Sequence, residues 1–432
     1  MSGYDYNFLL TVFYISYIVF EIPSNMACKY IGPGWFLPAI SLAFGIFSLC
    51  TAFVNNKAEA CAVRFLLGVA EAGALPGIAY YLSRSVAQDD LVTSANRFRW
   101  YRRSELTFRL ALYIVMAPLA GATGGLLASG ILKLNSFGSL RRWRMIFAIE
   151  GIVTIALSLI AFLTLTDRPE SARWLSREEK DLAIARVKSE RVATTNVLDG
   201  IDAAKTMRGI FSPVTLATAW IFLLDNITAG SLAFFLPTIV RTIYPKSSVV
   251  SQQLHTVPPY VVGACFVLLI SFTSWKTDKR NIFLVTTAPM MMIGYVMFLA
   301  TNKATVRYVA TFIIASGAFP YGSLCNAHVS ANVVSDTARA SGISTNVMFG
   351  NVGGLISSWA FLPFDAPDYH IGNGLNLATS TTIFISAILL GLYMTASNKR
   401  RDQVDMDAEL AGRTQAEIED LDWKHPGFRW KL

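Results

Sequence analysis

Charged residues are scarce in this sequence. Only 15% of the 432 residues are Asp, Glu, Lys or Arg, whereas soluble chains carry about a quarter. Hydrophobic residues make up 53%, and they are gathered into long apolar runs. This composition excludes an ordinary soluble domain. It indicates a protein that crosses the membrane many times, with the lipid bilayer as its partner.

Residues that commonly catalyse reactions or bind metals are also few. The five Cys residues lie within or beside apolar runs and have no spacing typical of a disulfide framework or a metal site. The four His residues are scattered, and no nucleophile, metalloprotease or nucleotide-binding motif is present. We therefore expect no enzyme activity, no metal and no cofactor.

The positive net charge of +8 does not indicate nucleic acid, because Lys and Arg lie in the gaps between apolar runs. Eleven of these runs are long enough to span a bilayer. Most Lys and Arg residues fall in alternate gaps, which predicts a cytoplasmic C-terminus and a first span that starts outside. The predicted spans are at about 6–27, 36–54, 58–82, 106–132, 143–165, 214–240, 254–274, 281–300, 306–328, 339–362 and 374–396.

A long polar gap divides the spans into five and six. We expect an N-terminal half at 1–165, a cytoplasmic linker at 166–213, a C-terminal half at 214–396 and a cytoplasmic tail at 397–432. Because the chain starts outside with an odd number of spans, we expect one further helix upstream of Met1. Six plus six helices around a central cavity is the layout of major facilitator transporters.

Two opposite charges stand inside the apolar segment 58–82. Arg64 and Glu71 are seven residues apart, so on a helix they share one face at a separation of about 10 Å. Charges in a bilayer face the protein interior and mark pathways for substrates or protons. The alternative is an internal ion pair, of Arg64 with Glu21 or Glu150, that holds neighbouring helices together.

Eight segments along the chain carry a family resemblance: Phe13–Asn25, Arg64–Gly73, Trp100–Leu106, Leu119–Leu127, Trp143–Gly151, Asp167–Ala172, Gly350–Ser358 and His425–Trp430. They resemble the fungal anion:cation symporters, a family of the major facilitator superfamily that includes allantoate, nicotinate and pantothenate permeases. The resemblance implies an all-α membrane protein with the major facilitator fold, in the plasma membrane and monomeric. It also implies symport of a small organic anion with a proton.

Two features depart from the family pattern. The opening helix, which in the family carries an Asp-Arg pair, is absent. Residues 85–99 form a polar insertion without periodicity before the Trp100–Leu106 segment. We expect both features to be errors in the prediction of the gene. The insertion would be a small intron that was wrongly kept as coding sequence.

The charged residues receive roles from their chemistry. Arg64 is the predicted anion anchor, because a guanidinium binds a carboxylate through two hydrogen bonds, and the family's Arg on this helix serves anion recognition. Glu71 is the predicted proton carrier, since burial and a nearby Arg act on its protonation in opposite directions. Tyr17 and Glu21 share a face of the first span, with Tyr17 expected to bind substrate. Glu21 is expected to serve proton coupling, gating or structure.

Polar residues of the C-terminal half complete the predicted site. Asn346 and Asn351 are candidates for substrate contact. Asp225 and Asn226 either line the cavity or form hydrogen bonds between helices. The gap at 275–280 lies where a gating motif belongs, and its Lys276, Asp278 and Arg280 are expected to form salt bridges rather than touch substrate. Competing interpretations of the whole chain are a nutrient sensor that does not transport and an inactive transporter fragment.

Overall fold

The computed structural model of the chain is a bundle of long helices. It describes residues 4–83, 112–131, 142–165, 176–179, 203–410, 412 and 421–432, and no strand occurs among them. Ten helices of the described ranges are long and apolar enough to cross a membrane. The predicted insertion at 85–99 and most of the predicted linker lie outside the described residues.

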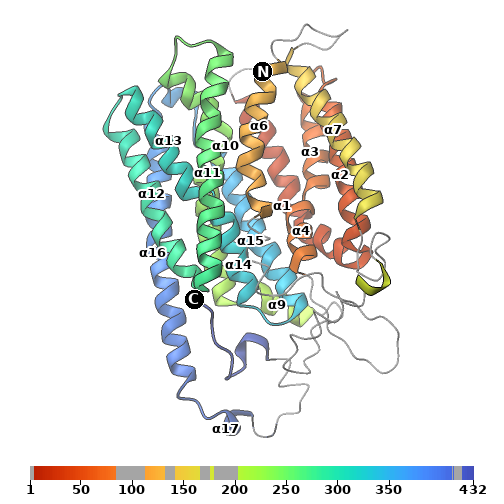
Figure 1. Cartoon of the computed structure of the whole chain (residues 1–432), viewed down its shortest axis with the longest axis vertical. Coiled ribbons are helices and arrows are strands. Elements are labelled where there is room, and N and C mark those ends of the chain that lie inside the picture. Colours follow the sequence, from red (N-terminus) through yellow and green to blue (C-terminus); the bar gives the residue numbers. More distant parts are fainter. Residues whose placement is uncertain are drawn as a thin grey trace.

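The N-terminal bundle lies on the right of Figure 1. Its third predicted span is two helices, because the chain turns at Ala72 and Gly73. A side chain on Gly73 would meet Ser24 of α1 and the ring of Phe36 of α2. Glycine at this position therefore permits both helices to pack closely against the turn between α3 and α4. The helices are α1 (Asp5–Ile31), α2 (Pro33–Thr51), α3 (Lys57–Glu71), α4 (Ala74–Ser83), α6 (Met116–Ile131) and α7 (Arg142–Thr164).

The C-terminal bundle lies on the left of Figure 1. Its helix starts follow familiar capping rules, since Ser248 and Ser335 each accept a backbone hydrogen bond from the residue three positions later. Pro320 separates the two pieces of the ninth predicted span. The helices are α10 (Pro213–Ile243), α11 (Val249–Thr277), α12 (Arg280–Ala300), α13 (Ala304–Ala318), α14 (Tyr321–Ala331), α15 (Asp336–Ser357) and α16 (His370–Arg401).

Helix α15 is the predicted span that is not among the ten apolar helices. It is rich in Ser, Thr, Asn and Gly, and it carries the buried Arg339. It packs against α10 on one side and α1 on another. Because protein rather than lipid covers it, this helix does not need an apolar surface.

Among the described residues, the two bundles meet mainly along two pairs of helices, and α4 also contacts α15. One pair is α1 with α15, and the other is α6 with α11. In the second pair a side chain at Gly121 would collide with the ring of Tyr260, so glycine sets the distance between α6 and α11. Figure 1 shows α6 and α15 in the middle of the molecule, where these contacts form.

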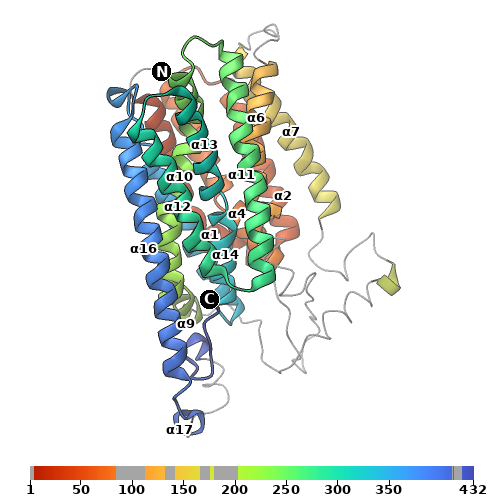
Figure 2. The same cartoon turned by 60° about the vertical axis from the view of Figure 1, so that its left-hand side comes forward.

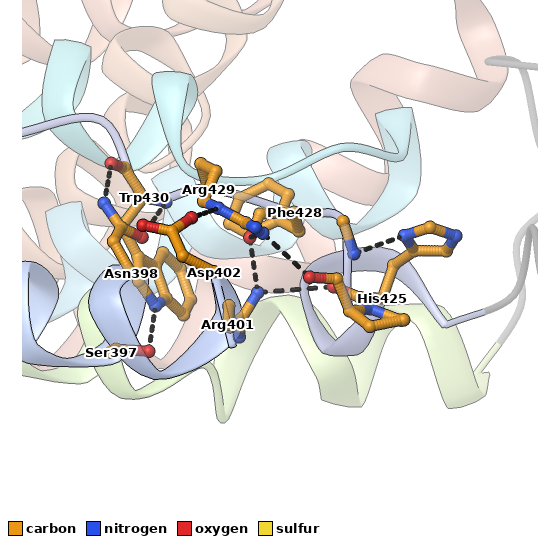
Figure 3. Close-up of polar contacts among 10 residues, drawn as sticks. Ser397, Asn398, Arg401, Asp402, His425, Phe428, Arg429 and Trp430 are labelled. Carbon is orange, nitrogen blue, oxygen red and sulfur yellow. Dashed lines mark hydrogen bonds and ion pairs between the residues drawn. The ribbon is translucent and has the colours of Figure 1, made fainter. Parts of the chain in front are cut away.

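The C-terminal segment Leu421–Leu432 folds back onto the end of α16, as Figure 3 shows. Trp430 is buried, and its backbone exchanges two hydrogen bonds with the Asn398 side chain, at 2.8 and 2.9 Å. Its indole nitrogen donates to Ser397 at 3.0 Å. Arg401 donates to the Phe428 carbonyl at 2.9 Å and lies beside the Trp430 ring. The segment is thus a folded part of the bundle.

The same segment joins several helices at one end of the molecule, which we call the tail end. The Leu432 carbonyl accepts from the first residue of α12, Arg280, at 2.8 Å. Asn332, after α14, exchanges two hydrogen bonds with the Lys431 backbone. The Asp422 carboxylate accepts from two backbone NH groups directly before α15. Trp423 donates to the carbonyl of Arg208 in α9 (Ala203–Ile210).

Candidate functional site

Arg64 and Glu71 lie on α3, which packs against α1. Both helices start at the same end of the bundle, where Lys57 Nζ and Asp5 Oδ1 form an ion pair at 2.7 Å. Arg64 and Glu71 are half-buried, and each acts electrostatically on the other. The predicted spacing of the two charges along one helix is therefore present in the fold.

Tyrosines of α1 surround these charges. The Glu71 charge acts on the hydroxyl groups of Tyr14 and Tyr17, and Tyr6 lies within electrostatic range of Arg64. The Glu71 charge also acts on the hydroxyl group of Tyr113, which lies just before α6. The site thus combines one guanidinium, one carboxyl and several hydroxyl donors.

Among the described residues, neither Arg64 nor Glu71 forms a direct ion pair. In the ranges that the structure describes, Arg64 has no carboxylate within 4.0 Å, and its guanidinium carbon lies 6.0 Å from the centre of the Phe147 ring. A structural pair of Arg64 with Glu21 or Glu150, the alternative considered for this helix, does not form in this conformation. Arg64 and Glu71 are both available to a ligand.

Glu21 connects the two bundles. It is fully buried on α1, and its Oε2 accepts from Asn351 Nδ2 of α15 at 2.7 Å. Its Oε1 has no hydrogen-bond partner among the described residues. Tyr17, one turn earlier on α1, lies within electrostatic range of both Glu21 and Glu71. The two predicted proton-coupling carboxyls therefore flank one tyrosine.

Other α1 residues contact α15 along its whole length. Asn7 Nδ2 donates to the Ser358 carbonyl at 2.6 Å, and Asn25 Nδ2 donates to Ser344 Oγ at 2.5 Å. Nearer the tail end, Lys29 Nζ donates to Thr337 Oγ1 at 2.8 Å. With Glu21–Asn351, these contacts form a ladder between the bundles, which we call the α1–α15 ladder.

The remaining predicted residues of the C-terminal bundle lie in different surroundings. Asn346 is fully buried and donates to Asn326 Oδ1 at 3.0 Å. Asn226 donates to the Phe222 carbonyl of its own helix and lies against glycines of α15. Asp225 is 2% exposed and lies among side chains of the C-terminal bundle. Arg64 and Asp225 therefore lie in different bundles.

The predicted gating residues lie at the turn between α11 and α12. Asp278 ends α11 in the left-handed conformation, with φ 51°, and its carboxylate is 3.1 Å from Arg280 Nη2. Lys276 lies over the Phe272 ring at 5.1 Å. The C-terminal segment binds this turn through Leu432.

Sequence reasoning did not identify Tyr6, Tyr14 or the ladder residues Asn25 and Lys29. Their spacing was visible, because Tyr14, Tyr17, Glu21 and Asn25 recur every three or four residues and thus share one face of α1. What this face contacts was not visible. In the described part of the chain, no cluster of His, Cys, Asp and Glu could hold a metal ion.

Comparison with known proteins places this arrangement in a family. Residues 1–358 match the family model of the Major Facilitator Superfamily. An uncharacterised transporter of Schizosaccharomyces pombe is 31% identical over 441 residues, covering 100% of this chain and 82% of its own length. The high-affinity nicotinic acid transporter of Saccharomyces cerevisiae is 28% identical, covering 100% of this chain and 77% of its own length.

The fold agrees with solved structures. A proton:xylose symporter of the major facilitator superfamily superposes with a TM-score of 0.66 at 14% identity, over 90% of this chain and 85% of that one. Such low identity supports the fold alone. The predicted all-helical membrane fold is thus confirmed, and the chain belongs to the major facilitator superfamily.

Proposed function

We propose that this protein is a secondary active transporter that carries a small organic anion together with a proton by alternating access. The observation that carries the proposal is the pairing of Arg64 and Glu71 on one helix, neither held by a direct ion pair in the described residues. A transporter of a carboxylate and a proton needs one site for each.

Arg64 would bind the substrate carboxylate, because its planar guanidinium offers two parallel hydrogen bonds that a lysine cannot match. Tyr17 would donate a further hydrogen bond from α1. Asn346, Asn351, Asp225 and Asn226 are the proposed contacts from the C-terminal bundle. The relationship to a nicotinic acid transporter supports small carboxylates such as nicotinate, allantoate or pantothenate as the substrate class.

Glu71 would carry the proton. Glu21 would be a second proton-coupling carboxyl, because its hydrogen bond to Asn351 joins the two bundles. When Glu71 is protonated and a monoanion binds Arg64, the site has no net charge. A neutral site lowers the cost of moving the loaded protein through its closed state, since uncompensated charge in a bilayer is expensive. One orientation of the two bundles would be favoured by the contacts that Lys276, Asp278 and Arg280 make at the tail end.

The proposal also includes a place and a form. The basic residues in alternate gaps support a cytoplasmic C-terminus, and the resemblance to the fungal anion:cation symporters supports the plasma membrane. A monomer is proposed, since one chain carries both bundles and all the residues of the candidate site.

Uptake of labelled carboxylates tests the proposal. The full chain is expressed in yeast cells that lack their own carboxylate permeases, and uptake is measured at pH 5 and pH 7. We expect uptake of one member of the panel, faster at pH 5. Arg64→Lys should reduce uptake about tenfold or more, and Glu71→Gln should remove its dependence on the proton gradient.

Lys246→Ala is the matched control, because Lys246 is an exposed cation in the turn between α10 and α11. Surface expression is measured for each variant, so that only chains at the membrane are compared. A chain that reaches the membrane and moves no carboxylate would overturn the substrate class. Uptake that is unchanged in Arg64→Lys and Arg64→Ala would remove the anion site from α3.

A further inference from the structure

The lipid-facing surface of α16 ends in two cations. Leu389, Leu392 and Tyr393 are each at least 46% exposed, as expected of side chains that face lipid in a spanning helix. Lys399 lies seven residues after Leu392, and Arg400 lies seven residues after Tyr393. Seven residues are two turns, so both cations continue the lipid-facing side of the helix, about 10 Å further along it. Both are exposed.

The opposite side of α16 is occupied by protein. Asn398 and Arg401 lie on that side and hold the C-terminal segment, as Figure 3 shows. Met394, one turn before Asn398, is fully buried there. Figure 2 shows α16 extending beyond α11 and α12 at the tail end. Lys399 and Arg400 thus lie on the side of α16 that neither the bundle nor the C-terminal segment covers.

Two further exposed cations lie at the turn between α11 and α12. Lys276 is one turn after the exposed ring of Phe272, and Lys279 directly precedes α12. Helix α12 packs against α16, where Asn281 Nδ2 donates to the Ala387 carbonyl at 3.2 Å. The ends of α11, α12 and α16 therefore lie next to one another. We call their four exposed cations the tail-end cation patch: Lys276, Lys279, Lys399 and Arg400.

No carboxylate of the described residues forms an ion pair with the patch. The acidic residues nearest to it in the sequence contact other arginines. Asp278 Oδ1 lies 3.1 Å from Arg280 Nη2, and Asp402 Oδ1 lies 2.9 Å from Arg429 Nε. The patch therefore keeps its positive charge.

Helix direction turns the side chains of the patch toward the bilayer. Helices α11 and α16 both end at the tail end, so the Cα–Cβ bonds of their last turns tilt back toward the apolar spans. Lys276 follows this rule, because its Nζ lies 5.1 Å from the centre of the Phe272 ring. Long basic side chains that lean back in this way carry their charge to the level of the lipid headgroups.

The chemistry of the partner follows from this charge and this position. A surface that is apolar along the span and cationic at its end matches a lipid with acyl chains and an anionic headgroup. We propose that the tail-end cation patch binds anionic phospholipids of the leaflet at the tail end. Arg400 binds a phosphate group through two hydrogen bonds, and Lys279 and Lys399 add charge. The acyl chains lie along Leu389 and Leu392.

Basic residues at the end of a helix also have roles that need no lipid. They stabilise the last turn through the helix dipole, and they set the orientation of the spans in the membrane. A patch with these roles alone would give a protein that responds equally to anionic and zwitterionic lipids. The dependence of stability on the lipid headgroup therefore separates a binding site from these roles.

Melting temperatures of the purified full chain in a neutral detergent test the site. Phosphatidylserine should raise the melting temperature more than phosphatidylcholine with the same acyl chains, because a ligand that binds the folded protein stabilises it. High salt should weaken this difference, since the patch is exposed. Equal responses to the two lipids would overturn the site.

Neutral substitutions locate the site on the protein. Lys399→Gln with Arg400→Gln should raise the phosphatidylserine concentration at half-effect about 30-fold, because each cation near an anionic surface contributes about a factor of five. Lys279→Gln should raise it about fivefold, and it serves alone if the double variant does not fold. Half-effect concentrations equal to that of the wild type would overturn the patch as the lipid site.

Lys246→Gln with Lys303→Gln is the matched control. Both are exposed cations at the opposite end of the same bundle, in the turns after α10 and α12, so the double variant loses the same charge. It should respond to phosphatidylserine as the wild type does. A shift as large as that of Lys399→Gln with Arg400→Gln would show that net charge alone sets the response, and it would overturn the site.

A soluble headgroup separates a lipid from a free anion. Glycerophosphoserine carries the same phosphate and serine groups without acyl chains, and it should have no effect at the concentrations that saturate with phosphatidylserine. An equal effect of the two would overturn the lipid site in favour of a site for free anions. No carboxylate is transported in these measurements, so a negative result leaves the proposed symport standing.

Discussion

The Glu21 carboxylate on α1 accepts a 2.7 Å hydrogen bond from the Asn351 side chain on α15, although 330 residues separate them in the chain. Glu21 is fully buried, and Asn351 is its hydrogen-bond partner among the described residues. The contact crosses between the N-terminal and C-terminal bundles. Any movement that separates α1 from α15 must therefore break this bond and re-solvate or protonate the carboxyl.

Asn351→Leu should destabilise the protein by about 1–3 kcal/mol, because it leaves both carboxylate oxygens of Glu21 buried without a donor. Glu21→Gln should lessen the effect of Asn351→Leu in the double variant, since a neutral amide costs less to bury. Thermal unfolding of the purified proteins measures both. Gln403→Leu, exposed after α16, is the control. A melting temperature of Asn351→Leu equal to wild type would show that the bond contributes nothing to stability.

The α1–α15 ladder predicts where a cross-link stops transport. Asn25 Nδ2 and Ser344 Oγ are 2.5 Å apart across the two bundles. In a chain whose native cysteines are replaced by serine, Asn25→Cys with Ser344→Cys should react with a short bifunctional thiol reagent and lose uptake. A reductant should restore uptake when the linker is reducible.

A pair within one bundle provides the control for this cross-link. Ser271 of α11 and Ser323 of α14 are 2.7 Å apart, and both belong to the C-terminal bundle. Cross-linking cysteines at these positions should leave most of the uptake, because α11 and α14 move together in a rocking mechanism. Equal inhibition by both cross-links would contradict separation of the bundles at the ladder.

The positions of the spans could be predicted from the sequence because hydropathy is a local property. The predicted span 143–165 and α7 at Arg142–Thr164 differ by one residue at each end. The point where a helix stops was harder to predict at the tail end of the molecule. Helix α16 continues to Arg401, whereas the predicted span ends at 396. Its basic residues remain helical because the C-terminal segment packs on them.

Contacts between distant segments could not be predicted in this way. Nothing local in the sequence pairs Lys29 with Thr337 or Asn398 with Trp430, because each pair depends on how the bundles and the C-terminal segment are arranged. The spacing of Arg64 and Glu71 was predictable, since it follows from helix geometry alone. The tyrosines around them depend on the packing of α1 against α3.

The docked C-terminal segment should contribute to stability. Trp430→Ala removes a buried indole that packs beside Arg401 and Trp423, and it should cost up to about 3–5 kcal/mol. We expect a lower melting temperature and faster proteolysis within the C-terminal segment. Val404→Ala is the control, because Val404 is 39% exposed in the turn after α16. Unchanged proteolysis of Trp430→Ala would mean that the other contacts of the segment hold it in place without the indole.

Gly354 of α15 should tolerate no side chain, because its Cα faces the ring of Tyr14 on α1. A methyl group there would lie 2.5 Å from the Tyr14 hydroxyl oxygen. Gly354→Ala should therefore cost about 1–3 kcal/mol and reduce uptake by displacing Tyr14 from the Glu71 site. Gly374→Ala is the matched control in α16, where nothing lies within 4 Å, and it should be neutral or stabilising by up to about 1 kcal/mol.

A second substitution separates overpacking from other causes. Tyr14→Ala makes room for the new methyl group, so Gly354→Ala should cost less stability in that background than in the wild type. Uptake should stay low in the double variant, because the Tyr14 hydroxyl is lost. If Gly354→Ala destabilises both backgrounds equally, its cost does not arise from Tyr14, and the close approach of α1 and α15 is not what requires glycine at this position.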